Sequence, residues 1–369
     1  MHDHGTATHT VPTVPQPYRM IDLFAGCGGL TCGFVSTGHF TPVAAVEHDL
    51  SAAATYAANH GEDHIHWGAI EDWVTGELPD ADIVVGGPPC QGFSNLGKRS
   101  STDPRNELWR HYMHTLLAVR PRAFLLENVD RFATSDQFAA LERETQPGGL
   151  LEDYDLDARL VRATDFGSFQ LRRRFIVIGT HRDLPKIHVP DGHVAKADWR
   201  TVEQALDGLE RDVDPADRDL PPATIERFGR IVPGEYKSPD LHITRRYTST
   251  SLARFRHIPE GGNRLNLPDR LKAPCWRGHD KGSLDVMGRL HWEHPSVTIR
   301  TEFFKPEKGR YLHPDRNRAI THHEAARIQG FPDEYLWCGS KIQIARQIGN
   351  AVPVELAEGL ATHLASSLT

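Results

Sequence analysis

The chain lacks the features that would assign it to several common classes. No apolar run approaches the roughly 20 residues that cross a bilayer, which argues against a membrane protein. Its first residues show no basic segment followed by an apolar core, so we expect no secretory signal. The 5 cysteines are scattered and form neither a disulfide framework nor a zinc pattern. We therefore expect a cytoplasmic, monomeric protein without a metal.

What is present is typical of a globular protein with one specialised surface. The 369 residues leave room for a substantial core and two domains, and the net charge of -7 argues against a protein that coats nucleic acid indiscriminately. Residues 240–320 nevertheless hold 16 Lys/Arg against 9 Asp/Glu. This basic segment on an acidic body indicates a dedicated polyanion-facing surface, although a solvated basic face without a partner is the alternative.

The first half of the chain alternates strand-like and helix-like segments. Apolar segments predict strands over residues 19–24, 42–47, 83–85 and 123–128. Helices are expected from about 30, over 51–59 with Ser51 as N-cap, and over 107–119. Later strands are expected at 161–163 and 175–179, as a possible hairpin. This alternation predicts an α/β fold with a doubly wound parallel sheet.

The remaining segments differ in character. Residues 1–17 are rich in His, Thr and Pro and are expected to be disordered. After a first domain over 18–185, residues 186–317 are loop-rich and predict a smaller domain of irregular or β structure. Helical patterning returns in 318–369, where Thr321 and Glu324 have capping-box spacing. A final helix over 354–364 is expected to cover the first domain.

The segment 86–94, Gly-Gly-Pro-Pro-Cys-Gln-Gly-Phe-Ser, directly follows a predicted buried strand. Two glycines and two prolines permit a sharp, stiff exit from that strand. The thiol of Cys90 would then lie at the carboxyl edge of the sheet, where open α/β folds bind ligands. The residues alone leave open whether Cys90 is a nucleophile or a packing residue.

A glycine cluster at 24–29 follows the first strand and precedes a helix. Such a turn lets a ligand approach the backbone and the free N–H groups of the helix start. It matches neither GxGxxG nor a phosphate-binding P-loop. Glu47 ends the second strand, where a carboxylate can bind both hydroxyls of a ribose. Together they indicate an adenosine-bearing cofactor; the alternative is a glycine-rich turn beside a solvent-facing glutamate.

Further polar side chains follow other predicted strands. Glu127 ends the strand at 123–128 and, when partly desolvated, can act as a general acid. Arg172 and Arg174 would share one strand face and suit an anionic or carbonyl-rich substrate. The plainer alternatives are a surface carboxylate and an exposed basic edge. The Gly-Asn turn at 349–350 can equally be a helix start.

Taken in order, these segments resemble the DNA (cytosine-5)-methyltransferase family. The resemblance covers most of 19–183 and 318–360. Six motifs carry it, at residues 22–30, 88–91, 127–129, 170–174, 318–333 and 347–352. It implies a Rossmann-like S-adenosylmethionine-dependent methyltransferase domain, with a target recognition domain at 186–317.

The resemblance also implies a mechanism and a partner, double-stranded DNA. Cys90 would add to carbon 6 of a flipped-out cytosine, and S-adenosylmethionine would methylate carbon 5. Glu127 would bind or protonate N3, while Arg174, with Arg172, would stabilise O2. A bacterial modification enzyme, with or without a cognate restriction enzyme, fits this single catalytic unit.

By the same resemblance, the remaining site residues fall into two sets. The positions expected to contact the cofactor are Phe24, Gly26, Cys27, Gly28, Glu47, His48, Ile70, Pro89, Leu108, Asn350 and Ala351. Those expected to contact DNA are Ser94, Gln170, Arg245, Arg246, Arg254, Arg256 and Arg264.

Two departures from the family pattern concern the cofactor site and local shape. Ala69 stands where an acidic residue usually binds the adenine amino group, and Asp72 is a candidate substitute. Phe169 replaces the proline that usually precedes the Gln-x-Arg-x-Arg segment.

Two other functions remain open. The tRNA-methylating branch of the same fold carries a Cys-Phe-Thr motif, whereas this chain has Cys-Trp-Arg at 275–277. A non-catalytic DNA-binding protein would not need Cys90, Glu127 and Arg174 together.

Overall fold

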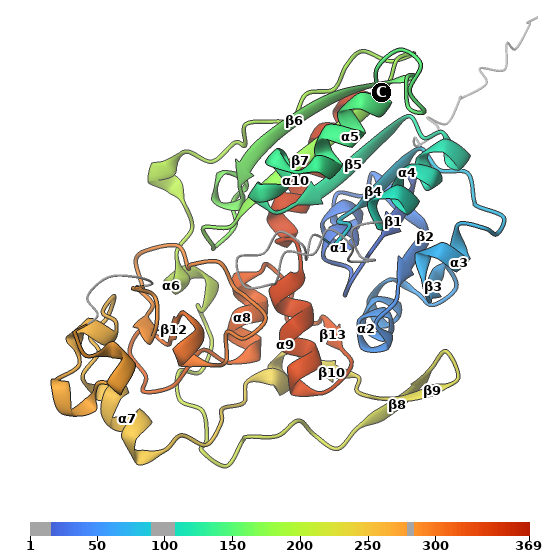
Figure 1. Ribbon diagram of the computed structural model, residues 1–369. Helices are drawn as coiled ribbons and strands as arrows, with labels where there is room; N and C mark the ends of the chain where they lie inside the picture. Colours follow the sequence, from blue (N-terminus) through green and yellow to red (C-terminus); the bar gives the residue numbers. More distant parts are fainter. Residues whose placement is uncertain (1–15, 90–107, 279–283) are drawn as a thin grey trace, which may run out of the picture.

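The computed structural model describes residues 16–89, 108–278 and 284–369. Their main feature is a seven-stranded sheet with strand order β3-β2-β1-β4-β5-β7-β6 (Figure 1). Six strands run in the same direction, and β7 runs antiparallel to its neighbours β5 and β6. The strands are β1 Tyr18–Leu23, β2 Phe40–Glu47, β3 Ile65–Trp67, β4 Ile83–Gly86, β5 Ala123–Asn128, β6 Tyr154–Arg162 and β7 Arg173–His181. The α/β prediction is confirmed, with one antiparallel strand added.

Helices connect and cover these strands. They are α1 Gly29–Ser36, α2 Leu50–His60, α3 Ile70–Trp73, α4 Leu108–Val119 and α5 Asp136–Glu144. The predicted N-cap of α2 is wrong: Asp49 caps the helix, accepting the Ala52 N–H at 3.0 Å, and Ser51 is buried inside the first turn. Both residue types favour caps, so composition alone did not separate them.

The predicted hairpin forms, but β6 begins seven residues earlier than expected, at Tyr154, and Ala163 already belongs to a 3-10 helix. The strand at the sheet's edge carries Asp155, Asp157 and Arg159. An edge strand is covered by neighbours on one side only, so it can carry polar residues. These residues interrupt the apolar run by which a buried strand is predicted.

Both faces of the sheet are buried. Along β4, Ile83 and Val85 pack on the α1 and α10 side, while Val84 packs on the α4 and α5 side. Strands covered on both faces read as continuous apolar runs, as the sequence does here. The final helix, α10 Val354–Leu368, packs against α1, as predicted, and its apolar face continues to Leu368. Among the helices of the described segments, none is long and apolar enough to cross a membrane.

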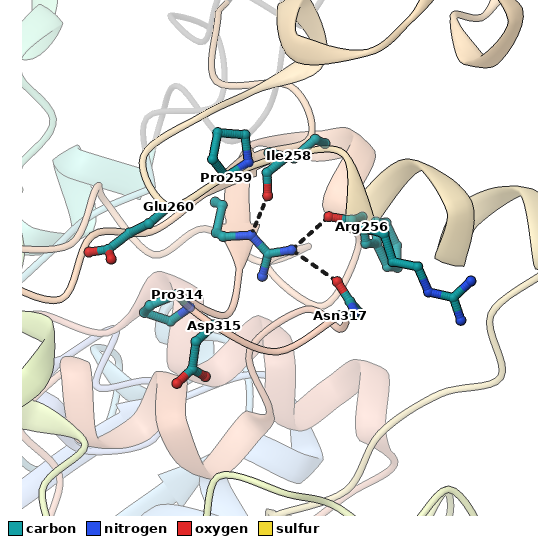
Figure 2. A pocket seen from close by; sticks show the side chains of 9 residues that line it. Arg256, Ile258, Pro259, Glu260, Pro314, Asp315 and Asn317 are labelled. Atoms are coloured by element: carbon teal, nitrogen blue, oxygen red, sulfur yellow. Dashed lines mark hydrogen bonds between the residues drawn. The ribbon is translucent and has the colours of Figure 1, made fainter.

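Residues 186–317 contain short elements joined by long irregular connections. These are α6 Val202–Ala205, β8 Thr224–Arg227, β9 Arg230–Pro233, β10 Tyr236–Lys237, α7 Ser249–Arg256, β11 Gly288–Arg289 and β12 Arg310–Leu312. The loop-rich prediction therefore holds. Buried Arg289 donates to the carbonyls of Phe255, Ile258 and His313 at 2.6 to 2.8 Å. Its guanidinium lies beside a cavity of about 300 Å³ (Figure 2).

The chain then returns to the sheet through α8 His322–Ile328, β13 Leu336–Trp337 and α9 Lys341–Asn350. The predicted capping box is present: the Thr321 hydroxyl accepts the Glu324 N–H, and the Glu324 carboxylate accepts the Thr321 N–H. The same carboxylate forms a buried pair with Arg318. Burial alone would raise the pKa of Glu324, but the charge and hydrogen bonds of Arg318 outweigh it and lower that pKa to about 2.

Candidate active site

The turn after β1 forms one side of a site at the carboxyl edge of the sheet. Phe24, Gly26 and Gly28 all have positive φ, at 59°, 57° and 88°. A Cβ at Gly26 would meet nothing within 4 Å, whereas one at Gly28 would lie 2.7 Å from the ring of His60. Gly28 is therefore required by close packing, whereas partly exposed Gly26 has open space beside its backbone.

Glu47 connects this turn to the end of β2. Its Oε2 accepts the Gly26 N–H at 2.9 Å, and its Oε1 accepts the Asp49 N–H at 2.7 Å. His48 Nδ1 lies 3.5 Å from the same carboxylate, and this contact raises the pKa of His48. The carboxylate is thus fixed by two backbone donors at the sheet edge, where it can still accept further hydrogen bonds.

Cys27 lies within the turn that follows β1 and is 2% exposed. Burial raises the pKa of its thiol, which disfavours the nucleophilic thiolate. The Tyr335 hydroxyl donates to the Cys27 carbonyl at 2.5 Å. The structure therefore places Cys27 as a lining residue of the turn.

The exit from β4 lies against β5. A side chain at Gly86 would collide with the Leu23 carbonyl, and a Cβ at Gly87 would lie 3.0 Å from Glu127 Oε2. Asn128 Nδ2 donates to the Pro88 carbonyl at 2.9 Å. The glycines thus permit close approach of neighbouring strands, and the chain leaves β4 directly beside Glu127.

Glu127 and Arg174 form an ion pair at this edge, from β5 and β7 respectively. Both side chains are nearly buried, with 12% and 13% of their surfaces exposed. Arg174 Nη1 also donates to the Arg173 carbonyl at 2.7 Å. A carboxylate and a guanidinium held side by side can bind adjacent polar atoms of one planar ring. Cys90 and Ser94 lie outside the described residues.

The predicted shared face of Arg172 and Arg174 is consistent with their burial: Arg173 is half exposed, whereas Arg172 is buried and Arg174 nearly so, although β7 begins only at Arg173. Arg172 is buried and donates to the carbonyls of Ile299 and Gly349, at 3.0 and 3.2 Å. Burial is the main cause that lowers its pKa. Arg172 therefore joins residues 186–317, called the second region below, to the end of α9 just before Asn350. Arg174 instead pairs with Glu127.

Gln170 is also inside the protein, at 0% exposure, so a direct DNA contact does not fit its position. Its amide donates to Gln329 Oε1 at 2.6 Å and accepts the Ile299 N–H at 3.1 Å. The amide group satisfies polar groups from two other segments of the chain. A glutamine next to arginines carries no local signal that distinguishes this buried role from a surface one.

The other predicted cofactor positions gather near the same edge. Ile70 is buried, and Leu108 is partly buried in the same apolar cluster. Pro89 is partly exposed, Asn350 is exposed and Ala351 is buried. Two positions depart from the family pattern. At the first, Ala69 is the N-cap residue of α3 and is exposed, as is its candidate substitute Asp72. At the second, Phe169 is buried and packs under the guanidinium of Arg200.

The predicted DNA-contacting arginines divide into two groups. Arg245, Arg246 and Arg256 are exposed. Arg254 is partly buried and donates to the Leu271 carbonyl at 2.8 Å. Arg264 is only 4% exposed, so the prediction of a surface contact fails there.

Asp22 is a polar residue of this edge that sequence reasoning did not select. It is fully buried in β1 and accepts the Thr31 hydroxyl at 2.7 Å. Burial raises its pKa to about 7. The available signal was a carboxylate inside the apolar run 20–24, where a charge is costly.

The strand order and the glycine turn after β1 define a Rossmann-like fold of the S-adenosylmethionine-dependent methyltransferase class. Residues 18–366 match the model of the C-5 cytosine-specific DNA methylase family, and the chain belongs to that family.

Related proteins and solved structures are consistent with this family. The chain is 30% identical to the type II methyltransferase M1.HphI of Haemophilus parahaemolyticus, over 92% of this chain and 85% of the relative. It is 31% identical to M.NgoPII of Neisseria gonorrhoeae, over 97% and 98%. A putative DNA modification methyltransferase from an E. coli prophage has 25% identity and a TM-score of 0.70, covering 95% of this chain and 99% of that one. The S. pombe Dnmt2 methyltransferase, at 18% identity and a TM-score of 0.62 over 94% and 98%, shares the fold.

Proposed function

We propose that this chain transfers a methyl group from S-adenosylmethionine to carbon 5 of a flipped-out cytosine in a specific double-stranded DNA sequence. It would act as a cytoplasmic monomer that marks host DNA in a modification system. The observation that carries the proposal is the Glu127–Arg174 pair beside Gly87, three positions before Cys90. Residues 186–317 would supply target recognition.

The turn after β1 and the Glu47 carboxylate fit an adenosine-bearing cofactor. Open space beside Gly26 allows a ligand to approach the backbone, and Glu47 is held in place to accept ribose hydroxyls. The exposed His48, the apolar Ile70 and Leu108, and the 350–351 turn would complete the site. When bound, S-adenosylmethionine supplies an electrophilic methyl group.

The chain's own groups would activate the base. Cytosine is a poor nucleophile at carbon 5 until the Cys90 thiolate adds its electron pair to carbon 6. The π electrons then shift to carbon 5 and toward N3 and O2, where Glu127 would protonate or bind N3 and Arg174 would stabilise O2. After methylation, a water molecule would take the carbon 5 proton, the C–H electron pair would re-form the 5,6 double bond, and the C6–S bond would break to release the Cys90 thiolate. A stacked base is inaccessible to these groups, so flipping is required.

Methyl transfer from labelled S-adenosylmethionine to duplex DNA tests the proposal. We expect transfer by the wild type, and a loss of at least about 1000-fold in Cys90→Ser and in Arg174→Gln. Arg173→Gln is the matched control, because Arg173 is half exposed and pairs with Asp130 at 3.8 Å. Substantial methylation by Cys90→Ser would contradict the covalent mechanism.

The same assay separates the two alternatives. Transfer to tRNA but not to DNA would assign the chain to the RNA-methylating branch. DNA binding without any transfer would leave a non-catalytic binding protein. Sequencing the methylated DNA would give the recognition site.

A further inference from the structure

The β8–β9 hairpin reaches from the second region back to the sheet. It lies beside α2 and β3, well away from α7 and β12 of the same region (Figure 1). Its two strands pair in register from Thr224 and Pro233 to Arg227 and Arg230, leaving Phe228 and Gly229 as the turn. The hairpin tip therefore lies near the edge of the sheet at which β2 ends with Glu47.

The tip contacts the segment after β2 through one tryptophan. The rings of Phe228 and Trp67 lie 5.9 Å apart at 34°. Trp67 Nε1 donates to the His48 carbonyl at 3.2 Å, and Trp67 pairs with Glu47 across β2 and β3. The Phe228 ring therefore covers the side chain that holds the Glu47–His48 backbone.

Other contacts hold the hairpin in this position. Glu62 Oε1, just after α2, accepts the Phe228 N–H at 3.3 Å, and Glu62 Oε2 pairs with Arg227 at 3.5 Å. Val232 of β9 is buried against Ala54 of α2. Because these contacts join separate segments, the tip is fixed relative to β3.

The turn sequence is unfavourable for a hairpin. Phe228 and Gly229 both have positive φ, 53° and 67°, as in type I′ turns, where Asn-Gly is preferred. An aromatic residue in this left-handed region is rare. Strained residues of this kind cluster at functional sites, and the ring contact with Trp67 is what phenylalanine gains here over asparagine.

We propose that the hairpin is a positioning element for the cofactor: Phe228 holds Trp67, and Trp67 holds the Glu47–His48 segment that binds the adenosine part of S-adenosylmethionine. This inference rests on the proposed function. It assigns a cofactor role to residues 224–233, which belong to the region otherwise proposed to read DNA.

Isothermal titration of S-adenosylmethionine into the full chain, without DNA, tests the inference. In Phe228→Asn we expect the Kd to rise about three- to tenfold, the usual worth of an aromatic pair. The thermal midpoint should stay equal or rise, because asparagine relieves the turn. Trp67→Phe, which removes the donor to His48, should also weaken binding. Ile231→Ala, at a position 69% exposed in the same hairpin, is the matched control and should bind as the wild type does.

The outcomes separate this inference from the proposed function. If Glu47→Ala abolishes binding while Phe228→Asn and Trp67→Phe bind as the wild type does, the hairpin role is wrong and the cofactor site stands. If the wild type does not bind S-adenosylmethionine, the proposed function and this inference both fail. A fall in affinity that Phe228→Tyr rescues supports the ring contact specifically.

Discussion

The sheet and the second region are stabilised by different means. In the sheet, residues such as Ile178 and Val177 alternate between two apolar faces, and strands and helices pair their own backbone groups. In residues 186–317, regular elements are short, and buried or partly buried arginines satisfy backbone carbonyls instead. The lesson is that a region poor in secondary structure needs side-chain donors for its carbonyls.

Arg289 and Arg310 illustrate this use of arginine. Arg289 donates to four carbonyls, those of Phe255, Ile258, His313 and Arg316. Arg310 donates to the carbonyls of Gly261, Gly262 and Arg289. Part of the basic surplus in 240–320 is therefore internal, and a charge count overestimates the surface available to DNA.

Arg289→Met is expected to cost about 3 kcal/mol of stability, because it leaves several buried carbonyls without donors. The loss should be local: hydrogen exchange should accelerate in α7 and 313–317 while the sheet stays protected. Ile178→Ala, with a similar cost of about 2–5 kcal/mol, should instead weaken protection throughout the sheet. Equal loosening of both regions by both variants would contradict the comparison.

Two largely buried carboxyls of the returning segment 318–369 should respond to pH in opposite ways. Glu355, at the start of α10, has its pKa raised from 4.5 to about 7, mainly by burial. Its charge therefore costs stability as pH rises from 4.5 to 7, and at pH 8 we expect Glu355→Gln to be about 2 kcal/mol more stable than the wild type. Thermal unfolding at pH 5 and pH 8 measures this, and the gain should be small at pH 5.

Glu324 is the matched control with the opposite sign. Since its pKa is lowered to about 2, the stability that it contributes is present above pH 4.5 and is lost as pH falls toward 2. Glu324→Gln should therefore be less stable than the wild type at neutral pH, with a deficit that shrinks below pH 4.5. A gain at pH 8 from Glu324→Gln would reverse the assignment.

Exposed arginines should give the smallest effects, on DNA binding alone. Arg246→Ala and Arg256→Ala should each weaken affinity by about 1 kcal/mol and lower the slope of log K against log salt by about one, if each meets a phosphate. Arg264→Ala, at a buried position, should lower the thermal midpoint instead. Fluorescence anisotropy across a salt series distinguishes these results.

The parts that the sequence predicted well are those set by local patterns. The strand at 123–128 and the capping box at Thr321 depend on neighbouring residues, and both were found as expected. The position of Glu47 at a strand end followed from the apolar run before it.

The parts that the sequence missed depend on distant partners. Gln170 bonds to Gln329 and Ile299, more than 120 positions away, and no local pattern reveals such a contact. The β8–β9 turn at Phe228 was not predicted either, because its phenylalanine stands where turn preferences place asparagine.

The proposed mechanism depends on attack by Cys90 on a flipped cytosine that is held by Glu127 and Arg174. The most direct test incubates the protein with S-adenosylmethionine and a duplex that contains 5-fluorocytosine, from which elimination cannot occur. We expect a covalent protein–DNA adduct whose peptide maps to Cys90 by mass spectrometry, and no adduct with Cys90→Ser. An adduct on another residue, or cytosine methylation of ordinary DNA without any trapped adduct, would contradict it.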